Sequence, residues 1–202
     1  MVGLSRSNNQ ATLPSRIPTF LLTLAIAMIS SGCSIMAPPY SPSPENLQLL
    51  RDGGKYTACV AEFGSQPGEQ NENPISIRGN TINSPYNGSY AGYLAEALRQ
   101  ELAMAGKWSQ SAETAVTGTV LTNTVHAPPA STGTVDIKVR FAVVRGSRKS
   151  YEQDKSVHHE FPSEFAGPIA IPRAIQEYQF AVHKLLAELY RDQAFVAALK
   201  SH

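Results

Sequence analysis

The side chains able to act as nucleophiles, acids or bases do not fall into a catalytic spacing. Ser89 lies in Gly88-Ser89-Tyr90-Ala91-Gly92, which differs from the nucleophile elbow because that motif places one residue between the first glycine and the serine. His158 and His159 are adjacent, and neighbours on a strand point to opposite faces, so the two imidazoles cannot readily bind one metal ion. We therefore predict no enzymatic activity, no metal site and no cofactor.

Cys33 is the residue whose surroundings point most clearly to chemistry. Two arginines precede an apolar run at residues 20–29, and the small residues Ser30-Ser31-Gly32 stand directly before the cysteine. A run of this length suits a secretory signal peptide and is short for a membrane span, which needs about 20 residues. We therefore predict a signal peptide at residues 1–32, cleaved in front of Cys33.

The residues around this cleavage site resemble the lipobox of bacterial lipoproteins, although Ser30 stands where that family usually has leucine. The resemblance implies that the Cys33 thiol receives a diacylglycerol and that the new amino group is acylated. Such acyl chains hold a protein on a membrane, because each buried CH₂ contributes about 0.8 kcal/mol. In this family an aspartate after the cysteine favours the inner membrane. This chain has Ser34, so we expect an outer-membrane, periplasmic location; an ordinary secreted protein is the alternative.

The composition is globular, with 42% hydrophobic and 16% charged residues. The predicted leader holds two of the 17 basic residues and none of the 16 acidic ones, so the mature chain is close to neutral. A nucleic-acid partner is therefore not expected, because it would require a basic surface. A small basic cluster surrounds a predicted hairpin tip, where it is either a solvated turn or a contact for acidic groups; its members are Arg145, Arg148, Lys149 and Lys155.

Beyond Cys33 the patterning predicts a Pro/Ser-rich tether and one domain. Residues 33–55 form the lipidated cysteine and the tether, which ends in a short helix capped by Ser43. Residues 56–202 form a single α+β domain. Leucines at spacing four predict a helix over 90–105, and strict alternation predicts a strand over 134–145. Further strands are expected at 56–63, 75–78, 114–125 and 150–161, and helices at 174–190 and 193–199. Ser89 is expected to cap the helix at 90–105, and Asp192 the last helix.

These elements have a simple packing solution. Each strand presents one apolar face and each long helix presents one apolar stripe, so both helices can cover the same face of the sheet. The predicted fold is therefore a two-layer α+β sandwich, with a mainly antiparallel sheet and two long helices on one face.

Two loops that lead into the long helices are the candidate binding surfaces. The loop at 77–90 contains an arginine that could pair with Glu164. Its tyrosines, together with Tyr93 and the loop that holds Phe165, could form a groove that stacks on sugar or lipid. The loop at 161–172 is so apolar that it must pack on its own sheet or be covered by a partner. The candidate partner- or ligand-binding residues are Arg78, Tyr86, Tyr90, Phe165, Ile169 and Ile171.

Several stretches, including SIRGNTINSPYNGSYAGYLAEALRQELAMAGKW and EFPSEFAGPIAIPRAIQEY, resemble a family of uncharacterised proteobacterial envelope lipoproteins. The likeness covers roughly residues 56–199 and brings no catalytic residue with it. The layout is also similar in topology to YajG-like and TolB amino-terminal domains, a likeness that does not give a function. We expect a non-enzymatic accessory or assembly factor that docks an envelope protein partner. The alternative is a periplasmic binder of a small ligand or cell-wall component.

Overall fold

The computed structural model describes Gly3 and residues 34–200. Gly3 apart, the predicted signal peptide and the lipidation site at Cys33 lie outside the described residues. Within residues 34–200, helices and strands form an α+β fold, which confirms the predicted class. In chain order the elements are β1 Ser34–Met36, α2 Pro44–Asp52, β2 Cys59–Ser65, β3 Ile75–Ile77, β4 Asn80–Asn83, α3 Tyr90–Met104, β5 Thr114–His126, β6 Ser131–Arg145, β7 Arg148–Ser163, α4 Gly167–Arg191 and α5 Gln193–Lys200.

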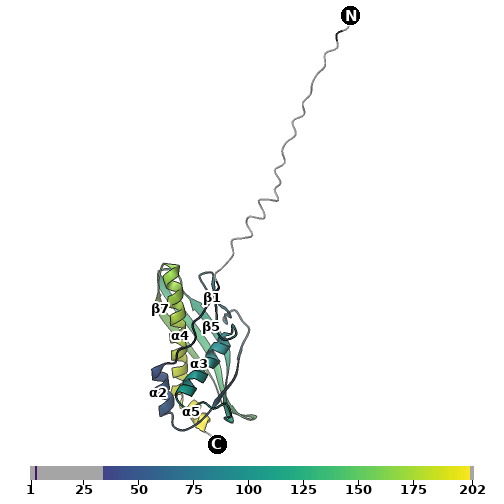
Figure 1. Ribbon diagram of the computed structural model, residues 1–202, viewed down its shortest axis with the longest axis vertical. Coiled ribbons are helices and arrows are strands. Elements are labelled where there is room, and N and C mark those ends of the chain that lie inside the picture. Colours follow the sequence, from purple (N-terminus) through teal and green to yellow (C-terminus); the bar gives the residue numbers. More distant parts are fainter. Residues whose placement is uncertain (1–2, 4–33, 201–202) are drawn as a thin grey trace. The chain divides into compact units, whose positions relative to one another are not determined.

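The main sheet has the strand order β2-β5-β6-β7. The run β5-β6-β7 is antiparallel, as predicted, and β2 adds to β5 in parallel. Helices α3 and α4 lie along this sheet (Figure 1), α3 against β2 and β5 and α4 against β6 and β7. The alternation in β6 buries one row of side chains against the helices, namely Val135, Ile137, Val139, Phe141 and Val143.

The helix ends follow the local signals in the sequence. The Ser43 side chain accepts a hydrogen bond from the Asn46 amide at the start of α2, and Ser89 accepts one from Gly92 at the start of α3. Gly106 follows α3 with a φ of 72°, the left-handed conformation that commonly ends a helix. Asp192 Oδ1 accepts a hydrogen bond from the Ala194 amide at the start of α5, as predicted.

The segment expected to be a tether packs on the domain instead. Residues Ser34–Met36 form β1, which pairs in parallel with β4, and Ala37 and Tyr40 are buried in the core. The segment is extended, as proline-rich chains are, but the backbone of its first residues forms hydrogen bonds with β4. Sequence patterning missed both strands because β1 has three residues and β4, Asn-Thr-Ile-Asn, carries one apolar side chain.

The apolar loop expected at 161–172 is also different. Residues 161–163 complete β7, and α4 begins at Gly167, well before the predicted start at 174. Pro168 stands in the first turn, where a missing amide donor costs nothing, while Pro172 lies inside the helix. The two prolines and the glycine masked the helical pattern in the sequence. As a result, Ile169 and Ile171 lie on a helix rather than in a loop.

Candidate docking surfaces

One end of the domain exposes a group of large apolar side chains. Met36 is the last residue of β1 and is 64% exposed. Phe165, two residues before α4, and Ile169, in the first turn of α4, are 78% and 60% exposed. Figure 1 shows β1 and the amino end of α4 at the same end of the domain, with α5 at the other. Isolated exposed apolar residues are ordinary, whereas several at one end of a domain are candidates for a contact surface. We call this the apolar end.

A groove joins the two parts of the apolar end. Its volume is about 400 Å³, and it runs between the β1 segment and the first turns of α4. Ile171, one of the candidates from the sequence, is half-buried and lines it together with Ile35. The other apolar side chains of its lining are Pro38, Pro168, Pro172 and Ile175.

Arg78 holds the apolar end in place and is not free to bind a partner. It lies in the tight turn between β3 and β4. Its Nε donates to the Ala127 carbonyl at 2.5 Å and its Nη1 donates to the Phe165 carbonyl at 2.9 Å. Its Nη2 donates to Ser163 Oγ at 3.0 Å and to the Glu164 carbonyl at 2.5 Å. The predicted pairing with Glu164 is therefore made to the backbone oxygen, and no ion pair forms between the two side chains.

The tyrosines expected to form a groove lie in the core. Tyr90 and Tyr93 are each 2% exposed and pack at 6.1 Å between ring centroids. Tyr86 is half-buried, and its hydroxyl accepts a hydrogen bond from the Tyr40 amide at 3.1 Å. The gap beside these rings measures about 10 Å³, less than a ligand needs. The proposed tyrosine groove is therefore wrong, because the helix turns these rings toward Tyr178 and the sheet.

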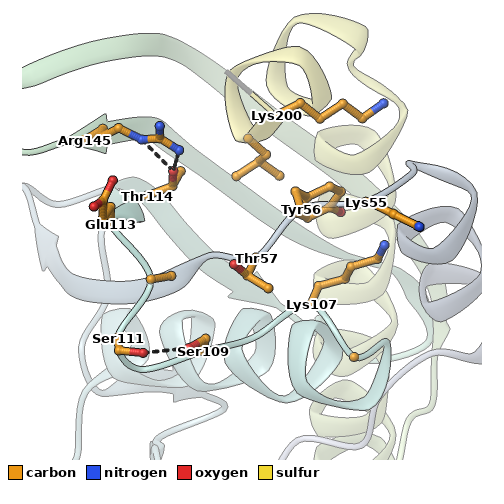
Figure 2. Close-up of a pocket in the computed structure, with 13 residues that line it drawn as sticks. Lys55, Tyr56, Thr57, Lys107, Ser109, Ser111, Glu113, Thr114, Arg145 and Lys200 are labelled. Atoms are coloured by element: carbon orange, nitrogen blue, oxygen red, sulfur yellow. Dashed lines mark hydrogen bonds between the residues drawn. The ribbon is translucent and has the colours of Figure 1, made fainter. Parts of the chain in front are cut away.

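A polar cleft of about 700 Å³ opens near the carboxyl end of the chain, and we call it the cationic cleft. Figure 2 shows Lys55, Lys107 and Lys200 around Tyr56 on one side of it, with Arg145, Thr114 and Glu113 on the other. Four cations thus line it against the single carboxylate of Glu113, among the residues that the structure describes. The hydroxyls of Thr57, Ser109, Ser111 and Thr114 complete its polar lining.

The cleft wall is ordered by internal contacts. Lys107 donates to the Gly54 carbonyl, and its ammonium lies 4.8 Å from the centroid of the Tyr56 ring. Burial raises the pKa of Tyr56 to about 12, so this phenol stays neutral. Arg145 Nη2 donates to Thr114 Oγ1 at 2.8 Å. No pattern in the sequence indicated this site beyond Arg145, because its three lysines come from segments 52 and 93 residues apart.

Several charged groups outside the cleft are paired with one another. On the outer face of the sheet His158 Nδ1 lies 2.6 Å from Asp136 Oδ1. This contact, with Glu160, raises the pKa of His158. His159 points to the other face, where its Nε2 lies 2.6 Å from Glu177 Oε2, so the adjacent histidines diverge as predicted. Within residues 34–200 no three His, Cys, Asp or Glu side chains gather closely enough to hold a metal ion.

A buried carboxylate fastens the amino-terminal segment to α3. Glu101 is fully buried and accepts hydrogen bonds from the Tyr40 hydroxyl at 2.6 Å, the Ser43 amide at 3.0 Å and the Asn46 side chain at 3.2 Å. Burial, followed by the charge of Glu101, raises the pKa of Tyr40. This arrangement holds residues 40–46 on the domain and leaves the carboxylate no open cavity in which to act on a substrate.

None of the helices in residues 34–200 combines the length and hydrophobicity needed to cross a bilayer. Cys59 is half-buried with its sulfur 3.5 Å from the Ala112 carbonyl oxygen.

Comparison with known proteins gives a fold but no function. The chain matches no protein-family model and no curated protein. A Xanthomonas campestris protein of the DUF330 family is 12% identical, with 81% of this chain and 96% of that chain covered and a TM-score of 0.56. A Caulobacter crescentus protein described as a candidate lipoprotein is 14% identical, with 79% and 99% covered and a TM-score of 0.45.

The likeness to the Xanthomonas protein shows that this chain shares its fold with an uncharacterised proteobacterial family. This shared fold agrees with the resemblance drawn from the sequence, at the level of an uncharacterised proteobacterial family. The similarity in topology to YajG-like and TolB amino-terminal domains stays a prediction.

Proposed function

We propose that this chain is an outer-membrane lipoprotein, anchored through Cys33 on the periplasmic side, that docks an envelope protein as a non-enzymatic accessory or assembly factor. The observation that carries the proposal is the opposite chemistry of the two ends of the domain. An apolar end begins directly after the predicted lipidation site, and a cationic cleft lies at the other end. A protein anchored at one end presents the other to its partners.

The cleft supports a partner with acidic groups. Lys55 and Lys200 are exposed at its rim and bring positive charge to an otherwise nearly neutral molecule. Complementary charge of this kind steers association and selects the partner more than it adds affinity. We therefore expect the partner to insert an acidic segment between the lysines and Arg145.

The proposal that the protein is not an enzyme is supported by the hydrogen bonds of its buried and half-buried carboxylates. Asp192 accepts hydrogen bonds from Lys155 and Tyr151, Glu177 from Arg173 and His159, and Glu101 from the amino-terminal segment. Each of these carboxylates joins structural elements to one another. Perturbed pKa values next to an open cleft would favour catalysis. The perturbed group in the wall of the cationic cleft is Tyr56, whose raised pKa keeps its phenol neutral, and the three carboxylates above lie outside that cleft.

The anchor is tested on the native protein. Mass spectrometry of the amino-terminal peptide should show Cys33 as the first residue, carrying a diacylglycerol and an acylated amino group, and the protein should fractionate with the outer membrane. An intact leader, or an unmodified sulfur on Cys33, would refute the proposal.

Docking is tested by photocrosslinking in the cell. A photoreactive amino acid replacing Ser111, which lines the cleft, should form an adduct with one envelope protein, while the same probe replacing Glu152 on the outer face should not. The double substitution Lys55→Glu and Lys200→Glu should abolish the adduct. The control variant, Lys138→Glu with Arg140→Glu, makes the same change of charge on the outer face of the sheet. It should still form the crosslinked adduct. Equal loss in both variants would contradict a docking role for the cleft.

A small ligand or cell-wall component is the second candidate. The volume of the cleft lies within the range of about 300–1,000 Å³ that small-molecule sites occupy, and its hydroxyls suit a sugar carrying an anionic group. Binding of purified muropeptides that Lys55→Glu weakens, together with no protein adduct at position 111, would favour this alternative.

A further inference from the structure

The chain leaves no spacer between the predicted lipid and the folded domain. Ser34 is the first residue of β1, where its Cα pairs with Thr81 and its Oγ accepts a hydrogen bond from Asn83 Nδ2 at 2.8 Å. The Ala37 amide then donates to the Asn83 carbonyl at 2.8 Å. Because neighbouring Cα atoms are about 3.8 Å apart, a lipid on Cys33 would be attached at the edge of this small sheet.

The part of the domain nearest to the predicted anchor is also the part with exposed apolar side chains. Five large hydrophobic side chains are clearly exposed in the described chain, and Met36, Phe165 and Ile169 are the three at the apolar end. The groove beside them is lined by Ile35, which lies two residues after Cys33, and by the first turns of α4. The anchor would therefore bring this end to the bilayer.

We propose that the apolar end is a membrane-insertion surface, in which Met36, Phe165 and Ile169 enter the leaflet that carries the Cys33 lipid. This inference rests on the proposed lipidation of Cys33. Apolar side chains of a peripheral protein lie about 5–10 Å deep, at the boundary between headgroups and acyl chains. The polar groups next to Phe165, the Glu164 carboxylate and the Arg78 guanidinium, then lie among the headgroups.

A bilayer fits this surface better than a protein partner does. A partner at the apolar end would have to fit between the domain and the leaflet, where β1 follows the anchor directly. Insertion also has a consequence for the opposite end, because several contacts with the bilayer fix the orientation of a domain that a single flexible anchor would leave free to tilt. The cationic cleft would then face away from the membrane.

The fixed backbone position of Phe165 supports the insertion of its side chain into the membrane. Arg78 binds the carbonyls of Glu164 and Phe165, so the backbone is held here while the ring is 78% exposed. A side chain whose backbone is ordered before contact loses less conformational freedom on insertion.

The test uses the mature lipidated protein, reconstituted into phosphatidylethanolamine and phosphatidylglycerol vesicles whose acyl chains carry bromine, which quenches tryptophan fluorescence on contact. Phe165→Trp is the probe, and its high exposure leaves room for the larger ring. Phe180→Trp is the matched control, because Phe180 is also exposed on α4 but lies eleven residues after Ile169, about 16 Å farther along the helix. The single native tryptophan, Trp108, gives a constant background in both variants.

Bromine should remove most of the emission added by the Phe165→Trp substitution and leave the emission added by Phe180→Trp unchanged. Equal emission from the Phe165→Trp variant in brominated and ordinary vesicles would overturn the insertion, as would equal quenching of the two variants. The mass of the amino-terminal peptide separates this failure from failure of the proposed function. A lipidated protein whose probe at position 165 is not quenched contradicts the insertion alone, whereas an unlipidated Cys33 contradicts both.

Discussion

Arg78 adopts a backbone conformation that residues with side chains seldom occupy. Its φ is 51°, and Gly79 follows with a φ of 77°, as the two-residue turn between β3 and β4 requires. Positive φ at a residue with a Cβ costs about 1–2 kcal/mol. The four hydrogen bonds of the guanidinium group offset that cost and join this turn to the end of β5 and to the junction of β7 with α4.

We predict that Arg78→Lys lowers the free energy of unfolding by about 2 kcal/mol, because an ammonium group cannot reproduce the planar fork that reaches four acceptors. Urea unfolding measures this change. Arg148→Lys, in the exposed hairpin between β6 and β7, is the matched control and should have little effect. Equal stability of the Arg78 and Arg148 variants would show that the guanidinium contacts contribute nothing.

Asp192 links the pH dependence of stability to the junction of α4 and α5. Burial opposes ionisation of this carboxyl, but hydrogen bonds from Lys155, Tyr151 and the Ala194 amide outweigh burial and lower its pKa from 3.8 to about 2. A carboxyl with a lowered pKa in the folded state stabilises that state above its ordinary pKa. The stabilisation is therefore present above about pH 4 and is lost as the pH falls through about 2.

Asp192→Asn should remove this dependence while keeping a side chain that can cap α5. We expect the variant to be less stable than the wild type near neutral pH, and the difference to shrink as the pH falls from the ordinary aspartate pKa toward the lowered one. Denaturant titrations at about pH 6, 4 and 2.5 span this window. A difference that does not change over this range would mean that the folded state does not favour the ionised carboxylate.

At the scale of elements, β2 is held to β5 by an aromatic ring over a glycine. Phe63 pairs with Gly118 across the two parallel strands. A Cβ added at Gly118 would lie closer than 3.0 Å to three carbons of the Phe63 ring. The ring can occupy this place only because position 118 has no side chain.

Gly118→Ala should therefore destabilise the domain by about 1–3 kcal/mol, the usual cost of overpacking a core. Thermal or urea unfolding measures the loss. Gly64→Ala, on the neighbouring strand with open space around it, is the control and should change little. Phe63→Leu should restore part of the stability of the Gly118 variant; if it adds to the damage instead, the ring is not the cause.

The whole molecule has two ends with different chemistry. The apolar end contains β1 and the amino end of α4, and the cationic cleft is formed near α5 and the carboxyl end of α3. Helix α4, whose 25 residues make it about 37 Å long at about 1.5 Å per residue, runs from one end of the domain toward the other (Figure 1). Under the two proposals, one chain would bind a membrane at one end and an acidic partner at the other.

Much of the fold could be predicted from the sequence, because its signals are local. The alternation of β6, the leucine stripe of α3 and the caps at Ser43, Ser89 and Asp192 each depend on residues close together in the chain, and the structure has them where predicted. The leader pattern before Cys33 is local as well, and it is the main motivation for the envelope assignment.

The surfaces were decided by tertiary structure. Tyr90 lies in the core, and Arg78 joins segments of the domain instead of facing a partner. The cationic cleft is lined by Lys55, Lys107 and Lys200, whose positions in the sequence follow no recognisable spacing. Hydrogen bonds such as that from Arg78 to Ala127, 49 residues away, and that from Tyr40 to Glu101, 61 residues away, have no local signature. Which side chains meet at a surface depends on the packing of distant segments. The sequence by itself therefore determined the longer elements and predicted the leader, and only the folded chain decided what its two ends present.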